Sequence, residues 1–147
     1  MGLDADLNKY KVEKVSKIDR ENYLDWREHY YCYVLNDDKE KWKKFEQCLF
    51  YTDDYLFNQI IIDSIKETTG DDYCEEGASL FNLDSLKLAI RKLQKTIKLG
   101  YYDEYIMNTK SQYEAREKEL NKLLEILDKE LENMVNNNYT YLYHATY

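Results

Sequence analysis

The C-terminal stretch, from Ser111 to Tyr147, constrains the fold more than any other part of the sequence because its hydrophobic period changes along it. In its first part, apolar residues recur at alternating steps of four and three, which places them on one face of a helix. Leu123, Ile126 and Val135 widen this face to the breadth that a globular core needs. The predicted face consists of Leu120, Leu124, Leu127, Leu131 and Met134.

The three asparagines at 136–138 are predicted to end this helix, because asparagine side chains compete for backbone hydrogen bonds. After them the pattern repeats every two residues, which is typical of a strand. An isolated strand would leave its backbone groups unsatisfied, and residues 7–15 are the other extended candidate. We therefore predict that strand 139–146 pairs antiparallel with the N-terminal strand near Tyr10 and Val12. One side of the C-terminal strand would carry Tyr139, Tyr141, Tyr143, Ala145 and Tyr147.

Two helices are predicted after the N-terminal strand. Ser16 is expected to cap the first. Residues 39–49 are expected to form the second, because Trp42, Phe45 and Leu49 recur at helical spacing. The first helix would carry an aromatic stripe of Tyr23, Trp26, Tyr30 and Tyr33.

Two further helices have clearer ends. The acidic residues after Thr52 complement a helix dipole and predict a helix N-terminus there, and Gly70 is predicted to end that helix. Residues 70–80 are predicted to form a loop. Asn82 is predicted to cap the next helix, which would end at Gly100. Its core face would contain Leu83, Leu86, Ile90, Leu93 and Ile97.

The length and these elements predict one domain, 1–147, of the α+β class and mostly α. It would hold several amphipathic helices and a small antiparallel sheet that pairs the N- and C-terminal strands. The excess of 29 acidic over 21 basic residues gives a net charge of −8, which disfavours direct binding to nucleic acid or to anionic membranes. No apolar run suits a membrane span, the start lacks a signal-peptide pattern, and three cysteines fit a reducing compartment. A cytoplasmic protein is expected.

Residues that carry out catalysis or bind metals are scarce. His29 and Cys32 stand three positions apart on a predicted helix, where they could share a metal ion or form a thiolate–imidazole pair. No second His/Cys pair completes a zinc site, and four glycines leave little material for a phosphate-binding loop. We therefore expect no enzymatic activity, metal or cofactor. A small metalloprotein using His29 and Cys32 remains an alternative.

Two charged segments are candidate interaction sites. The acidic segment could form part of a partner-binding surface, hold a divalent cation, or simply be solvated. A basic stripe at helical spacing could be a solvated outer face, or could dock an acidic partner that includes a second copy of this chain. The acidic segment contains Asp71, Asp72, Tyr73, Glu75 and Glu76, and the basic stripe contains Lys87, Arg91, Lys95 and Lys98.

Several short motifs together resemble a family of small proteins common in phages and bacterial mobile elements. They are Met1-Gly2-Leu3-Asp4, Tyr10-Lys11-Val12, Asp25-Trp26-Arg27, Cys74 before a leucine-rich helix, and the aromatic strand from Tyr141 to Tyr147. Members of that family are generally of unknown function. The resemblance therefore implies a phage-type accessory protein, and it assigns no site residues.

These observations favour a binding protein, plausibly an inhibitor of a bacterial defence system comparable to an anti-CRISPR protein. It would contact a host protein, such as a nucleic-acid-binding defence complex, through an acidic surface rich in the chain's 16 tyrosines. The principal alternative is a self-associating structural protein, in which case a homodimer is possible.

Overall fold

The computed structural model describes residues 2–11, 46–71, 77–102, 110–136 and 139–147. Its four strands form one antiparallel sheet in the order β2-β1-β4-β3. The N- and C-terminal strands are therefore the two central strands of the sheet. The described fold is α+β and mostly α, as predicted. The strands are β1 (Asp4–Lys11), β2 (Glu46–Thr52), β3 (Gly77–Leu80) and β4 (Tyr139–Thr146).

The predicted pairing of the two terminal strands is confirmed. β1 and β4 run antiparallel over their whole lengths, with Asp4 opposite Thr146 and Tyr10 opposite Thr140. The bounds of β4 are those predicted, whereas β1 begins at Asp4 and not at residue 7. Ala5 is only 1% exposed, so the alternation of buried and polar residues extends further back than the predicted start. Val12 lies outside the described residues.

β2 corrects the prediction of a helix over residues 39–49, because residues 46–49 belong to this strand. The register shifts between Leu7 and Asn8, so that Phe50 faces Leu7 while Cys48 faces Asn8. Leu49 is the extra residue of this β-bulge. This bulge interrupts the period of two that is expected of a strand, and Trp42 and Phe45, which set the helical spacing in the sequence, lie outside the described residues.

β3 corrects the prediction that residues 70–80 are all loop. It is four residues long and pairs with β4, with Ser79 opposite Tyr143 and Leu80 opposite Leu142. A short Gly-Ala-Ser-Leu segment has little strand propensity of its own, so its pairing partner determines its conformation.

The predicted ends of α5 (Leu83–Leu99) and the predicted C-terminal end of α4 (Tyr55–Thr69) are confirmed. The predicted start of α4 is corrected, because Thr52 ends β2 and no acidic residue lies in the first turn of the helix. The Asp54 side chain accepts a hydrogen bond from the Phe57 amide at 2.9 Å, which caps α4. Asn82 and Ser85 form a reciprocal capping box at the start of α5. Gly70 and Gly100 end the two helices with φ of 75° and 79°, a left-handed conformation that favours glycine.

The long helix predicted from Ser111 is divided into α6 (Lys110–Glu114) and α7 (Glu117–Asn136). Its buried row also differs from the predicted face. The fully buried residues of α7 are Leu120, Leu123, Leu127 and Glu130, whereas Leu124, Leu131 and Met134 are only partly buried against the core. The helix is thus rotated so that a carboxylate points inward.

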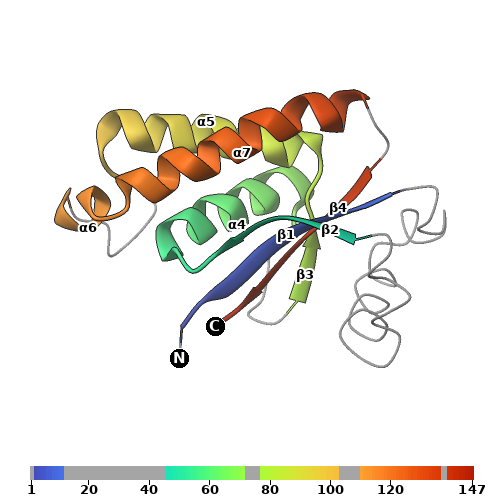
Figure 1. The fold of residues 1–147 in the computed structure, drawn as a ribbon, viewed down its shortest axis with the longest axis horizontal. Helices are drawn as coiled ribbons and strands as arrows, with labels where there is room; N and C mark the ends of the chain where they lie inside the picture. Colours follow the sequence, from blue (N-terminus) through green and yellow to red (C-terminus); the bar gives the residue numbers. More distant parts are fainter. Residues whose placement is uncertain (1, 12–45, 72–76, 103–109, 137–138) are drawn as a thin grey trace.

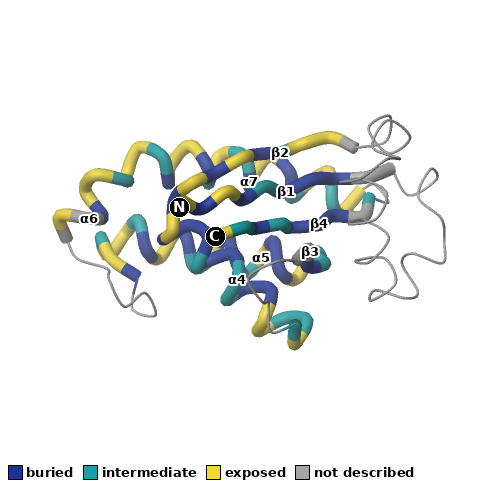
Figure 2. The backbone as a smooth tube through the Cα atoms, turned by 90° about the horizontal axis from the view of Figure 1, so that it is seen from below, coloured by how far each residue is buried: buried dark blue, intermediate teal, exposed yellow. Residues whose placement is uncertain are grey.

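The helices α4, α5 and α7 lie on one side of the sheet, with α4 nearest to the strands in the view of Figure 1. α5 packs against both α4 and α7. Buried residues follow the faces where these layers meet (Figure 2). The core includes Leu7, Phe50, Phe57, Ile61, Phe81, Leu86, Leu93, Leu120, Leu127 and Tyr143.

Candidate functional site

Most of the acidic segment predicted from the sequence lies outside the described residues, namely Asp72, Tyr73, Glu75 and Glu76. Asp71 is described, and it is half-buried with its backbone N–H donating to the Thr69 hydroxyl at 3.1 Å. His29 and Cys32 also lie outside the described part. A role for the acidic segment in partner binding therefore stays a prediction, and so does the alternative of a metalloprotein that uses His29 and Cys32.

The basic stripe is described in full. Lys87, Arg91, Lys95 and Lys98 are all exposed, on the side of α5 away from its buried residues Leu86 and Leu93. Within the described part of the chain, no hydrogen bond or ion pair joins any of these four side chains to another residue. The stripe thus presents four cations to solvent on one helix face.

A second charged surface, not predicted from the sequence, lies where β1 begins and β2 ends. Tyr51 is 57% exposed and donates a hydrogen bond from its hydroxyl to Asp4. Asp6 is opposite Tyr51 in the register of the two strands, and Asp53 is exposed two residues further along. We call these four residues the tyrosine–acid surface. Tyr55, 38% exposed at the start of α4, lies close to it in sequence.

The electrostatics of Tyr51 reflect this arrangement. Its hydrogen bond to Asp4 raises the pKa of the phenol, and the charges of Asp4, Asp53 and Asp6 raise it further. The phenol therefore stays protonated and keeps donating to the carboxylate. The exposed Tyr51 ring thus lies beside the exposed carboxylates Asp4 and Asp53 and the half-buried Asp6.

Asp6 connects this surface to the middle of the sheet. It is opposite His144 in the β1–β4 register and accepts a hydrogen bond from the Asn8 amide at 2.8 Å. Burial raises the pKa of Asp6, and the neighbouring His144 lowers it in part. Burial also lowers the pKa of His144, against the attraction of Asp6. The pair thus sits in an environment that favours the neutral form of each group.

A buried ion pair joins α7 to the sheet. Lys9 and Glu130, 7% and 5% exposed, are 3.1 Å apart, and the Tyr141 hydroxyl donates to the same Glu130 oxygen at 2.6 Å. Lys9 also lies over the Tyr139 ring, 4.7 Å from its centroid. Burial and the hydrogen bond to Glu130 raise the pKa of Tyr141. These contacts hold two layers together and leave no open site.

Tyr143 of β4 and Tyr147, which follows the strand, share one amide of α4. The Tyr143 hydroxyl donates to the Asn58 carbonyl oxygen at 2.5 Å, and the Asn58 amide donates to the Tyr147 hydroxyl at 2.6 Å. Asn58 is 2% exposed and Tyr143 is completely buried. This chain of polar groups fixes the helix over the C-terminal strand.

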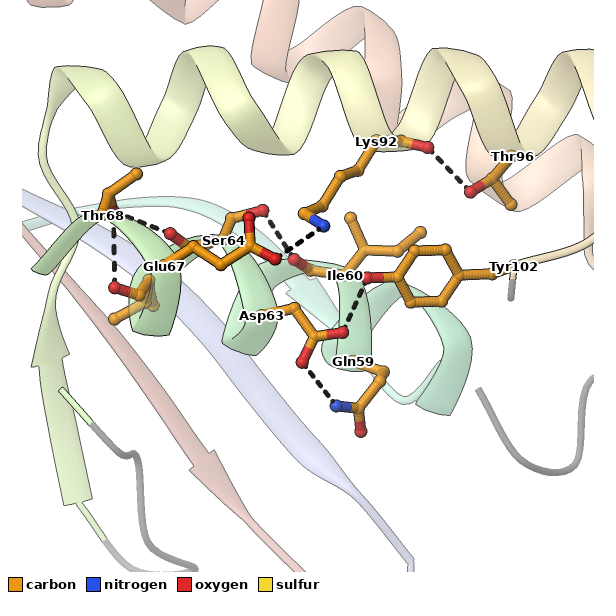
Figure 3. A network of polar contacts seen from close by, with 10 residues as sticks. Gln59, Ile60, Asp63, Ser64, Glu67, Thr68, Lys92, Thr96 and Tyr102 are labelled. Carbon is orange, nitrogen blue, oxygen red and sulfur yellow. Dashed lines mark hydrogen bonds and ion pairs between the residues drawn. The ribbon is translucent and has the colours of Figure 1, made fainter. Parts of the chain in front are cut away.

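A further polar network links α4 to α5 and to the segment after it (Figure 3). Asp63 accepts hydrogen bonds from the Tyr102 hydroxyl at 2.6 Å and from the Gln59 amide at 2.9 Å. Lys92 forms an ion pair with Glu67 at 3.1 Å. Every group in this network has a partner within it, so its role is to hold the helices together.

Among the described residues, no group of three or more His, Cys, Asp or Glu side chains could hold a metal ion. Over the same residues, no helix is long and apolar enough to cross a membrane. The chain matches no family model, and it shows no significant similarity to a curated protein or to a solved structure. Within the described residues, the candidate interaction sites are therefore the tyrosine–acid surface and the basic stripe, and the support for each is its geometry, since no related protein was found.

Proposed function

We propose that this chain is a non-enzymatic binding protein that docks a basic surface of a host protein through its tyrosine–acid surface. The observation that supports this most is Tyr51, a large side chain 57% exposed and bonded to Asp4 on the sheet's exposed end. Tyrosine is enriched at interfaces because its ring adds contact area and its hydroxyl remains hydrogen-bonded. The carboxylates around it would steer a positively charged partner toward contact.

The finer proposal is that the partner is a nucleic-acid-binding complex of a bacterial defence system, in the cytoplasm of the host. Three carboxylates spaced around an aromatic ring offer the combination of negative charge and stacking surface that a nucleic acid offers to its protein. The net charge of −8 supports the same reading, since it favours approach to a basic channel. The protein would act as an anti-CRISPR-like inhibitor by occupying that channel.

Affinity capture from host lysate at two salt concentrations tests the proposal. We expect wild-type protein to retain a basic host protein, with less retained as salt screens the charges. Tyr51→Ala should reduce retention at least tenfold, as expected for a central aromatic contact residue. The matched control is Tyr101→Ala, because Tyr101 is 43% exposed but follows α5 and lies outside the tyrosine–acid surface.

A growth assay tests the finer proposal. Phage carrying the wild-type gene should grow in hosts that contain the defence system, and phage carrying Tyr51→Ala should grow poorly there and normally elsewhere. If no host protein is retained, and deletion of the gene leaves phage growth unchanged in defence-bearing hosts, the proposed function is wrong. Equal retention by Tyr51→Ala and Tyr101→Ala would locate the contact elsewhere on the chain.

A further inference from the structure

The basic stripe on α5 is the second surface that needs an explanation. Like charges four residues apart on a helix repel and destabilise it by about 0.2–0.5 kcal/mol for each pair. Lys87, Arg91 and Lys95 form two such pairs, and Lys98 extends the row. Each of Lys9, Lys92 and Arg116, by contrast, lies within 4 Å of a described carboxylate. Within the described residues, the stripe is therefore a row of cations that no carboxylate neutralises through an ion pair.

Apolar side chains extend the same surface at its C-terminal end. Leu99 and Tyr101 follow Lys98 directly and are 44% and 43% exposed. From Lys87 to Lys98 the helix advances by about 16 Å, at about 1.5 Å for each residue. The stripe and these two residues thus combine charge with contact area, as protein interfaces do.

The chain carries a surface of complementary charge, the tyrosine–acid surface. Its carboxylates Asp4, Asp6 and Asp53 are opposite in sign to the four cations of the stripe. The two surfaces belong to opposite sides of the molecule. Ala5 and Leu7 face the helices, so the alternation of a strand directs Asp4 and Asp6 to the other face of the sheet. The stripe lies on the exposed side of α5, and α5 belongs to the helical layer (Figure 1). One copy cannot bring its own two surfaces together.

We propose that the basic stripe on α5 docks the tyrosine–acid surface of a second copy of this chain. Because two different surfaces meet, the contact is heterologous, and a pair of copies keeps one free stripe and one free tyrosine–acid surface. Such contacts build rings or open chains of copies. They do not build a closed two-fold dimer.

This contact uses the tyrosine–acid surface, which the proposed function assigns to a basic host protein. At that surface a copy can therefore bind either the host protein or a second copy, but not both. A basic host surface would therefore compete with self-association and release the copies from one another. The two proposals can fail separately. Substitutions in the stripe affect self-association and leave the tyrosine–acid surface, and with it the proposed host binding, intact.

A charge-swap experiment tests the contact. The first variant carries Arg91→Glu and Lys95→Glu, and the second carries Asp4→Lys and Asp53→Lys. All four positions are exposed, and circular dichroism would verify that both variants fold. Sedimentation over a concentration series and over about 0.01 to about 1 M salt measures the mass of each sample. Wild-type protein should form assemblies that disperse as salt rises.

Each variant alone should associate at least tenfold more weakly than wild type. The substitutions leave the stripe of the first variant without net charge, and they make the tyrosine–acid surface of the second positive like its stripe. An equimolar mixture of the two should associate again, because the unchanged stripe of the second variant then meets the unchanged tyrosine–acid surface of the first. The matched controls on α7 are Lys118→Glu with Lys122→Glu, and Glu125→Lys with Asp128→Lys. They make the same charge changes at exposed positions outside both surfaces and should assemble like wild type.

Four outcomes would overturn the proposal, three in the assembly measurements and one in a binding assay. The first is a wild-type monomer at every salt and concentration. The second is an equal loss of assembly in the control variants, which would indicate a general effect of net charge. The third is a mixture of the two variants that does not assemble. Binding of a labelled single-stranded oligonucleotide by monomeric wild type, lost with Arg91→Glu and Lys95→Glu, would assign the stripe to phosphate groups and reject the second copy as its partner.

Discussion

Glu130 departs most clearly from what its sequence context predicts. It stands in a helix whose apolar residues define the core face, and it is itself 5% exposed within that face. One of its oxygens accepts from both Lys9 and Tyr141, which come from the two central strands. Hydrophobic periodicity cannot identify such a residue, because the partners that make its burial tolerable lie far away in the sequence.

Replacing Glu130 by leucine should strongly destabilise the fold. Breaking a buried ion pair leaves an uncompensated charge, which costs about 3–5 kcal/mol. The free energy of unfolding, measured with denaturant, would show the loss. Adding Lys9→Met and Tyr141→Phe removes both orphaned groups and should recover most of it. If Glu130→Leu alone unfolds at the wild-type denaturant concentration, the ion pair is not important for stability.

The Asp6–His144 pair should make stability depend on pH in two opposite ways. Burial lowers the pKa of His144 in the folded protein. As pH falls below about 6.5, His144 is therefore protonated in the unfolded chain before it is protonated in the folded one, and the free energy of unfolding decreases. Burial raises the pKa of Asp6 in the folded protein. The stability that Asp6 contributes is therefore present at low pH, and it is lost as pH rises from about 3.8 through the pKa of Asp6 in the folded protein.

Two single substitutions separate these contributions. His144→Gln should flatten the fall in stability just below pH 6.5, measured as the free energy of unfolding against pH. Asp6→Asn keeps an acceptor for Asn8 and should stabilise the protein at pH 7, with no gain at the lowest pH. A pH profile of His144→Gln that coincides with wild type between pH 5 and 7 would show that His144 does not titrate differently on folding.

At the scale of elements, β4 was predicted with its bounds and partner, while β2 and β3 were missed. Period-two alternation with buried aromatics made β4 visible, whereas a bulge in β2 and the shortness of β3 hid them. The same two features protect the edges of the sheet, since short or bulged edge strands resist pairing with other chains. The tyrosine–acid surface could not be predicted because β2 itself was not predicted. It depends on the register between β1 and β2, which no local pattern reveals.

Truncation after Asn138 should abolish stable folding. β4 is paired on both sides, with β1 and β3, so its loss separates the remaining strands. It also removes the buried residues Tyr141, Leu142 and Tyr143. The loss of several kcal/mol is a large share of the stability of a small domain. Thermal unfolding followed by circular dichroism would reveal a truncated chain that keeps its transition, which would contradict the assigned role of β4.

A milder change tests one contact of the same strand. Tyr143→Phe retains the buried ring but leaves the Asn58 carbonyl oxygen without that donor, at a cost of about 1–3 kcal/mol. Denaturant unfolding would measure the difference. Tyr51→Phe is the matched control, because its hydroxyl is bonded at an exposed position and its loss should change stability little.

At the scale of the whole molecule, the two ends of the chain meet at the centre of the sheet. Asp4 is opposite Thr146, and the N- and C-termini lie close together in Figures 1 and 2. Forming this central pair requires closure of nearly the whole chain, which carries a large entropic cost before any contact forms. Contacts between residues distant in sequence slow folding across small proteins. Closure of β1 onto β4 should therefore limit the folding rate.

A circular permutant tests this prediction. A short glycine-serine linker would join Tyr147 to Gly2, and the new ends would lie between α5 and α6, at Asp103 and Glu104. The central strand pair then becomes a local hairpin, so refolding after denaturant dilution should be faster than in wild type. The unfolding rate should change little, because the native contacts are the same. A permutant that folds at the wild-type rate would show that another step limits folding. One that fails to fold would show that the wild-type connection at residues 103–104 is required by the fold.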